Sequence, residues 1–189
     1  KSYQDLIEIA IAKAKAIDPH NRAIIYYRNG KQESDQEGKK IFEDIIVIYE
    51  LAANALDCED GLEEAIFFTR GEEIFAQVIY MAANERGRIE TLIDANAPYI
   101  EQFVANNDRD LLYKVYIAQR QNEKAVSELY KLITEAIATD SQRIEWINTA
   151  RILENGTQSK LSKKIEEALD CTIKHQRTTI LKGDDINKK

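Results

Sequence analysis

The chain has 189 residues, of which 44% are hydrophobic and 31% are charged, a balance typical of a globular domain with exposed helix faces. Its formal net charge of −7 argues against a general nucleic-acid-binding domain, because phosphate binding rests on clustered Lys and Arg. Only seven glycines and two prolines are present, and long stretches rich in Ala, Glu, Lys, Leu, Ile and Gln favour helix. We therefore expect an all-α fold.

The first half predicts a helix, an irregular segment and a second long helix. Apolar residues at helical spacing place the first helix from Ser2 to Ile17, and Pro19 ends it, because proline disfavours the α conformation in the residue before it. We interpret residues 23–27 as a short helix rather than a strand, and residues 29–38 as a polar loop. Residues 39–56 are apolar nearly all round, so we expect this helix at the centre of the N-terminal half, buried on most sides.

Shorter helices follow, bounded by capping signals and helix breakers. They are Asp60–Phe68 before Gly71, Glu72–Asn84 before Gly87, Arg88–Ala95, a helix with Pro98 in its first turn, a helix capped by Asn107 with Asp110, the pair within Asn122–Leu153, and a last helix from Thr157 toward Ile180. The count is about ten helices joined by short turns, the layout of an irregular, α-solenoid-like stack.

The pair within Asn122–Leu153 is the most informative stretch. Asn122 is a plausible cap for its first helix, whose apolar residues recur at steps of three and four: Ala125, Val126, Leu129, Leu132, Ile133, Ala136 and Ile137. The second helix opens at Ser141 and carries two apolar rows, one with Ile144, Ile147 and Arg151, the other with Trp146, Ala150 and Leu153. A surface helix needs one stripe, so the second row requires cover from the chain's own next helix or from another protein. Trp146 fits either a core position or an interface anchor.

Patterns for catalysis and metal binding are nearly absent. Neither His20 nor His175 has a carboxylate at metal-ligand spacing, and the sequence contains no HExxH, ExxH, GxGxxG, P-loop or GxSxG. Cys58 and Cys171 form no CxxC pair, as is typical of idle thiols in a reducing compartment. We predict no enzyme activity, no catalytic, cofactor-binding or metal-binding residues, and no cofactor.

The sequence also bears on membrane-spanning and secretory patterns. No apolar run approaches the ~18 residues that a membrane-spanning helix requires, and no signal peptide is visible. The sequence starts within a helical pattern without a Met. We interpret residues 1–189 as a single α-helical domain excised from a longer protein.

Three stretches resemble the C-terminal α-helical domain of the nucleoporin 133 family, scaffold proteins of the Y-shaped outer-ring complex of the nuclear pore. They are Glu101–Leu132, SQRIEWINTARIL at Ser141–Leu153, and KLSKKIEEAL at Lys160–Leu169. The nucleoporin 155 family of the inner ring shares the same order of helices and is the close competitor. Its members usually carry a longer insert before the helix that corresponds to Asp110–Ala118, and this chain lacks it, which favours the outer-ring family.

The resemblance implies a C-terminal part of a larger scaffold protein, located in the nucleus at the nuclear pore complex and supporting nucleocytoplasmic transport and mRNA export. The implied partner is the 84/107-type α-helical nucleoporin of the Y complex, docked end to end. No small-molecule substrate, direct nucleic-acid contact or membrane span is implied.

The family's contact, carried over position by position, gives a candidate partner interface at Trp146, Thr149, Ala150 and Leu153. The small Thr149 and Ala150 would let a partner helix approach closely. The tryptophan departs from the aliphatic residue that is more usual in the family at position 146.

Two further hypotheses stay open from the sequence. One is a generic α-helical adaptor domain of a coat-type or inner-ring assembly, which would share the open apolar stripe and differ in its partner. The other is an enzyme or small-ligand domain, which an apolar groove closed by the chain's own helices, with convergent polar groups, would favour.

Overall fold

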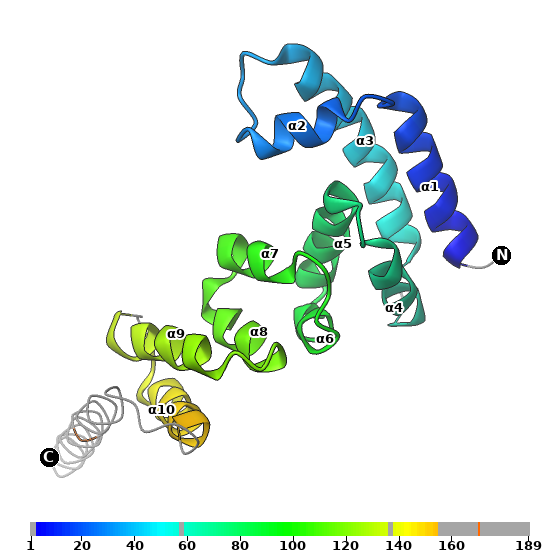
Figure 1. The fold of residues 1–189 in the computed structure, drawn as a ribbon. Helices are drawn as coiled ribbons and strands as arrows, with labels where there is room; N and C mark the ends of the chain where they lie inside the picture. The colour runs from blue at the N-terminus through cyan, green and yellow to red at the C-terminus, as the bar shows by residue number, and fades with distance from the viewer. Residues whose placement is uncertain (1–2, 57–58, 136–137, 155–169, 171–189) are drawn as a thin grey trace, which may run out of the picture. The chain divides into compact units, whose positions relative to one another are not determined.

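The computed structural model describes residues 3–56, 59–135, 138–154 and 170. Within these ranges the chain forms ten α-helices and one 3₁₀ turn and no strand, which confirms the all-α prediction (Figure 1). Contacts divide the chain into two compact units, Lys1–Phe103 and Val104–Lys189. That both act as a single domain stays a prediction. The predicted last helix, apart from Asp170, lies outside the described residues, and so do both cysteines and His175.

The N-terminal unit contains α1 (Tyr3–Ile17), α2 (Arg22–Arg28), α3 (Gln36–Ala55), α4 (Glu59–Phe68), α5 (Glu73–Glu85) and α6 (Ile89–Asp94). The boundary between the units falls within α7 (Ile100–Asn107). The C-terminal unit continues with the 3₁₀ turn η1 (Arg109–Leu111), α8 (Leu112–Ala118), α9 (Asn122–Glu135) and α10 (Asp140–Glu154).

The long helix α3 lies at the centre of the N-terminal unit, as predicted, and packs against α1, α2 and α5. It is not buried on most sides, because Val47 and Leu51 are 55% and 68% exposed. The helix with the most extensive burial is α5, whose buried residues are Glu73, Ile74, Phe75, Ala76, Val78, Ile79, Tyr80 and Ala83. An apolar composition gives the hydrophobicity of a helix, whereas the neighbouring helices decide which of its sides are covered.

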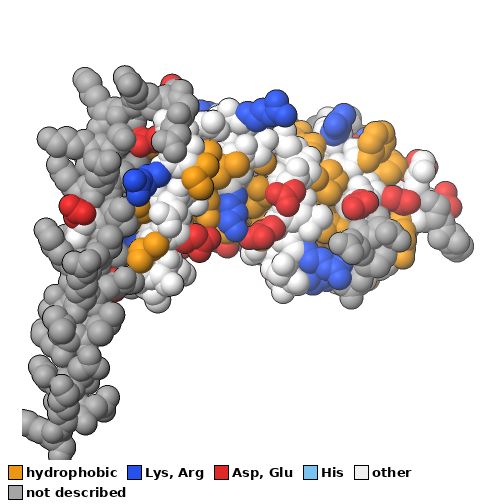
Figure 2. Space-filling model, turned by 90° about the horizontal axis from the view of Figure 1, so that it is seen from below, with side chains coloured by type: hydrophobic (Ala, Val, Ile, Leu, Met, Phe, Trp, Pro, Cys, Tyr) orange, Lys and Arg blue, Asp and Glu red, His pale blue; other side chains and the backbone are white. Residues whose placement is uncertain are grey.

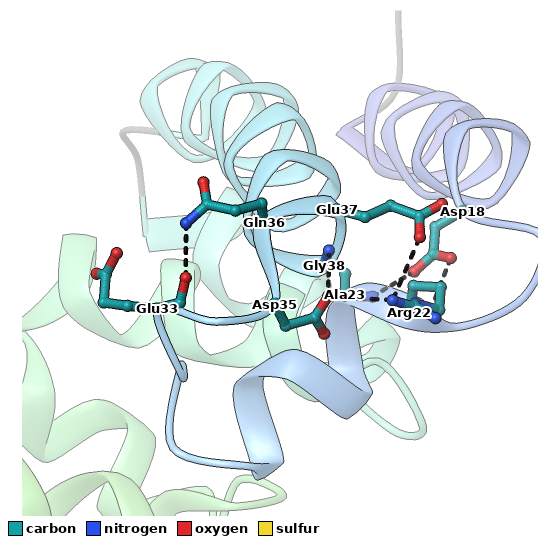
Figure 3. Close-up of polar contacts among 8 residues, drawn as sticks. All are labelled: Asp18, Arg22, Ala23, Glu33, Asp35, Gln36, Glu37 and Gly38. Carbon is teal, nitrogen blue, oxygen red and sulfur yellow. Dashed lines mark hydrogen bonds and ion pairs between the residues drawn. The ribbon is translucent and has the colours of Figure 1, made fainter.

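Asp18 connects α1 to α2, the short helix predicted at residues 23–27. Its carboxylate accepts hydrogen bonds from the backbone N–H groups of Arg22 (2.8 Å) and Ala23 (2.7 Å), while its side chain is almost fully buried (Figure 3). The carboxylate therefore satisfies two of the free donors at the start of α2.

The start of α3 is fixed by Asp35, which accepts a hydrogen bond from the backbone N–H of Gly38 at 3.0 Å (Figure 3). Arg22 Nη2 lies 3.0 Å from the same Asp35 oxygen and 3.3 Å from Glu37 Oε2. A Cβ at Gly38 would come within 2.5 Å of Asp35 Oδ2 and 2.9 Å of Tyr26 Cβ. The predicted loop at residues 29–38 is therefore too long: its final glycine lies in the first turn of α3, where a side chain would collide.

Two boundary predictions at the ends of α7 are wrong. Pro98 is not in the first turn of α7, because Tyr99 adopts a left-handed conformation (φ 62°) and the helix begins at Ile100. Asn107 closes α7 instead of capping the next helix, and Asp108 precedes η1. The carbonyl of Pro98 instead accepts a hydrogen bond from the hydroxyl of Tyr80.

Candidate partner-binding surface

The surface predicted to bind a partner belongs to the C-terminal unit, where α9 packs against both α8 and α10. The predicted inner face of α9 is confirmed at Ala125, Val126, Leu129, Leu132 and Ile133, all of which are buried. Ala136 and Ile137 fall outside the described residues. The core cluster of this unit contains Tyr113, Val126, Leu129, Leu132, Ile133, Trp146, Ile147 and Ala150.

The start of α10 is set by a reciprocal cap that the sequence analysis missed. Thr139 Oγ1 accepts from the backbone N–H of Gln142 at 3.3 Å, and Gln142 Oε1 accepts from the backbone N–H of Thr139 at 3.0 Å. The Thr-x-x-Gln spacing is the sequence signal of such a capping box. The helix therefore begins at Asp140, and Ser141 lies within its first turn rather than capping it.

The candidate row on α10 divides into buried and accessible members. Trp146 is 8% exposed and Ala150 is 0% exposed, and both belong to the core cluster of the unit. Leu153 is half-buried and packs against that cluster. Thr149 is also half-buried, and its hydroxyl donates to the carbonyl of Glu145 at 2.9 Å, which leaves its methyl group for contact. A partner could reach Trp146 or Ala150 only by displacing what covers them, so their direct contact with a partner stays a prediction.

Ile152 is the most exposed large hydrophobic residue of α10, at 73%. It belongs to neither of the two rows recognised in the sequence, and it follows Thr149 by three residues and precedes Leu153. Residues three apart on a helix are neighbours on its surface. Thr149, Ile152 and Leu153 therefore form an accessible strip, which we call the α10 strip. An isoleucine on the polar side of the helix was the signal that could have indicated it.

A small cleft in the N-terminal unit bears on the enzyme hypothesis. It has a volume of about 100 Å³, and its polar lining consists mainly of Lys15, Asp18, Arg28, Tyr49, Glu72 and Glu73. The charged groups pair with one another: Lys15 Nζ lies 2.5 Å from Glu72, and Arg28 donates twice to Glu73 Oε2, at 3.0 and 2.7 Å. Asp18 caps α2. These contacts leave no evident nucleophile or general base in the cleft.

Burial raises the pKa of Tyr27, Tyr49 and Tyr80 in the N-terminal unit, and the last two are the most buried of them. It raises the pKa of Tyr49, with a smaller contribution from the negative charge of Glu72. It also raises the pKa of Tyr80 to about 12. Both shifts stabilise the neutral phenol, which suits core positions rather than proton transfer near neutral pH.

The described residues contain neither a metal-binding cluster nor a helix suited to cross a membrane. No group of three or more His, Cys, Asp and Glu side chains lies in an arrangement that could hold a metal ion in that part of the chain. Among the helices described, none is long and apolar enough to cross a membrane.

The chain is similar to a described protein family and to a curated protein. The family described as non-repetitive/WGA-negative nucleoporin C-terminal matches residues 1–180. A probable nucleoporin of Schizosaccharomyces pombe is 25% identical over 210 residues, which covers 97% of this chain and 16% of that protein. The chain therefore spans only a small part of the length of this relative.

Proposed function

The chain belongs to the non-repetitive/WGA-negative nucleoporin C-terminal family, and from this premise we propose that it is a structural, non-enzymatic scaffold domain of the nuclear pore complex. The observation that carries the proposal is the family match over residues 1–180. The all-α architecture agrees with it. Such a domain acts at the nuclear envelope, where it supports nucleocytoplasmic transport and mRNA export by holding other nucleoporins in place.

The partner in this proposal is another α-helical nucleoporin, the 84/107-type neighbour in the Y complex, docked end to end. The resemblance of Ser141–Leu153 to the nucleoporin 133 family supports this choice, and so does the lack of an insert before Asp110–Ala118. Docking to an inner-ring neighbour, as in the nucleoporin 155 family, is the alternative. A coat-type adaptor would use the same surface with a different partner.

The docking surface in this proposal is the row Trp146, Thr149, Ala150 and Leu153, engaged through the α10 strip. Trp146 and Ala150 anchor α10 to the core of the unit, so Thr149 and Leu153 are held in fixed positions. Ile152 extends this surface by a side chain that is already open to solvent. Complete burial of an exposed isoleucine contributes up to about 1.5–3 kcal/mol, and Ile152 is 73% exposed, so it can act as a central contact.

Binding of an 84/107-type C-terminal helical domain to the Ile152→Glu variant tests the docking surface. The variant places a charge where a partner must desolvate it, so we expect affinity to fall by at least about tenfold. The melting temperature should be unchanged, because the new carboxylate stays in water in the free chain. Ser127→Glu on α9 is the matched control, since Ser127 is also exposed on a helix of this unit. Equal affinity of Ile152→Glu and the unaltered chain would contradict the proposed surface.

The same titration with an inner-ring helical nucleoporin separates the two rings. Binding to the 84/107-type domain alone supports the outer-ring assignment. Binding to the inner-ring protein alone overturns that assignment while leaving the scaffold role and the α10 strip intact.

A further inference from the structure

The outer side of α3 carries an apolar row that no described helix covers. Val47, Leu51 and Ala55 are exposed at intervals of four residues, which places them along one side of the helix over about 12 Å. The opposite side of α3 contains its buried residues and packs against α1, α2 and α5. This row, which we call the α3 row, lies in the N-terminal unit and is independent of the α10 strip.

Carboxylates flank the α3 row on both sides. Glu43 and Asp44 precede Val47 by one turn, and Glu50 lies between Val47 and Leu51 in the sequence; all three side chains are exposed. At 100° per residue, Glu43 and Glu50 fall on one side of the row and Asp44 on the other. The row is therefore apolar in the middle and negatively charged at its edges.

Two lysines lie at the N-terminal end of the same helix. Lys39 Nζ is 2.9 Å from Glu33 Oε2, so its charge is already engaged by the loop before α3. Lys40 is exposed one turn before Asp44. The negative charge therefore dominates along the stretch from Glu43 to Glu50.

The next helix repeats the arrangement. In α4, Glu63 and Glu64 are exposed and precede Phe67, which is 68% exposed. In both helices the residue directly after the acidic pair is buried: Ile45 is 4% exposed and Ala65 is 0% exposed. On the face seen in Figure 2, exposed hydrophobic side chains lie among both acidic and basic side chains. An apolar residue one turn after two carboxylates is thus a recurrent surface feature of this unit.

We propose that the α3 row binds a basic amphipathic helix of a partner protein. A helix laid along the row would place apolar residues at steps of three and four against Val47 and Leu51. Lys or Arg residues beside that stripe would reach the flanking carboxylates, and their long aliphatic stems would cover the rest of the apolar surface. The row is short, so the contact is a weak, reversible one rather than a permanent interface.

The charge of the row selects against other occupants. Nucleic acids and anionic membrane surfaces carry the same sign as Glu43, Asp44 and Glu50, so both are repelled. A second copy of the chain would bring its own acidic row against this one, which is unfavourable for the same reason.

Synthetic helical peptides test the proposal on the full chain. The probe is an Ala-rich peptide of about 18 residues with a leucine stripe flanked by lysines, long enough to form a helix. One reference peptide keeps the leucine stripe and replaces the lysines by glutamates. A second keeps the lysines and disperses the leucines, so that it has charge without an apolar face.

The chain supplies matched variants for the titration. Val47→Ser with Leu51→Ser removes the apolar row, and Glu43→Gln with Asp44→Asn removes two flanking charges without changing shape. Ile9→Ser is the control, because Ile9 is 65% exposed on α1 but has Asp5 and Lys13 one turn away on either side, so its surroundings are of mixed charge.

Of the three peptides, we expect only the lysine-flanked one to bind. Its affinity should fall roughly tenfold in each double variant, stay unchanged in Ile9→Ser, and weaken with added salt. Binding that is indifferent to the Val47 and Leu51 changes, or shared by the dispersed peptide, would reduce the contact to non-specific charge attraction and overturn the proposal. Concentration-dependent dimers that disappear in the Val47 and Leu51 variant would assign the row to a second copy instead. The carboxamide variant keeps the test decisive if the serine variant fails to fold.

Discussion

The two units are stabilised in different ways. In the N-terminal unit, polar side chains join elements far apart in sequence: Arg28 pairs with Glu73 across 45 residues, and Tyr80 donates to the carbonyl of Pro98 across 18. In the C-terminal unit, short-range side-chain hydrogen bonds, such as the cap of Thr139 and the bond from Lys131 to Glu128 at 2.6 Å, accompany a longer-range ion pair between Arg109 and Glu128 at 3.8 Å. There the helices are held by the apolar cluster of α8, α9 and α10.

This difference indicates what each unit can tolerate. A unit whose helices meet in one apolar cluster is sensitive to any charge placed in that cluster, and insensitive to changes on its outer surface. A unit whose helices are joined by hydrogen bonds between distant polar side chains depends on the partners of those groups and on pH. The former suits a surface that accepts a partner, because the α10 strip can change while its support stays intact.

The largest effect is expected from Ala150→Glu. Ala150 is fully buried in the C-terminal cluster, so a carboxylate there has no space and no partner. We expect a loss of about 3–5 kcal/mol in the free energy of unfolding of this unit. Trp146 is the only tryptophan of the chain and lies in the same cluster, so its fluorescence reports this unit in a urea titration.

Asn148→Glu is the control for that change, since Asn148 is exposed on the same helix and gains the same charge. A normal fluorescence transition in Ala150→Glu would show that the cluster is not what holds α10. A transition lost in both variants would show that α10 tolerates no added charge on either side.

The next effect is a loss of stability of the N-terminal unit in alkali. Unfolded tyrosine titrates near pH 10, whereas the pKa of Tyr80 in the fold is about 12. The folded state therefore holds this proton more tightly, so the contribution is complete below pH 10 and is lost between about pH 10 and 12. The difference between these two pKa values limits the contribution of Tyr80 to the free energy of unfolding to about 2–3 kcal/mol.

Tyr80→Phe separates this contribution from general alkaline effects. The variant loses the hydroxyl contacts and should be less stable at neutral pH, but its stability should fall less steeply between pH 10 and 12. The stability of the variant should still fall somewhat with pH, because burial also raises the pKa of Tyr49. Urea unfolding followed by circular dichroism gives both slopes, and equal slopes would contradict the buried-phenol account.

The smallest losses in the free energy of unfolding are expected when one helix cap is removed from each unit. Asp18→Ala removes a buried carboxylate with two backbone donors, and we expect a cost of about 1–2 kcal/mol. Thr139→Ala removes a cap that is exposed to water, and we expect about 0.5–1 kcal/mol. Urea titrations of both variants give the ranking, and a larger loss for Thr139→Ala would reverse the proposed contrast between the units.

The sequence predicted the helices of this chain better than their ends. Hydrophobic periodicity depends on local spacing, so the inner face of α9 and the position of α5 follow directly from the apolar residues. The boundaries depend on which side chain reaches a free backbone amide. The interpretation of Gly38 as a loop residue failed because the tight approach of Asp35 and Tyr26 appears only in three dimensions.

Exposure was the harder quantity to predict. The apolar composition of α3 suggested burial on most sides, yet Val47 and Leu51 face solvent because no described helix packs on that side. On α10, periodicity found both rows but could not tell which one faced the core, and it overlooked Ile152. The resemblance to the nucleoporin 133 family supplied the candidate interface, and the structure supplied the accessibility of each member.

The most direct test of the docking surface is hydroxyl-radical footprinting of the chain, alone and in complex with an 84/107-type helical domain. In the free chain, Ile152 should be oxidised readily, because its side chain is 73% exposed, whereas Trp146 should react slowly despite its chemistry. In the complex, the account predicts strong protection of Ile152 and Leu153, with Val47 and Leu51 still reactive. Unchanged oxidation of Ile152 in a saturated complex would contradict it and place the docking surface elsewhere on the chain.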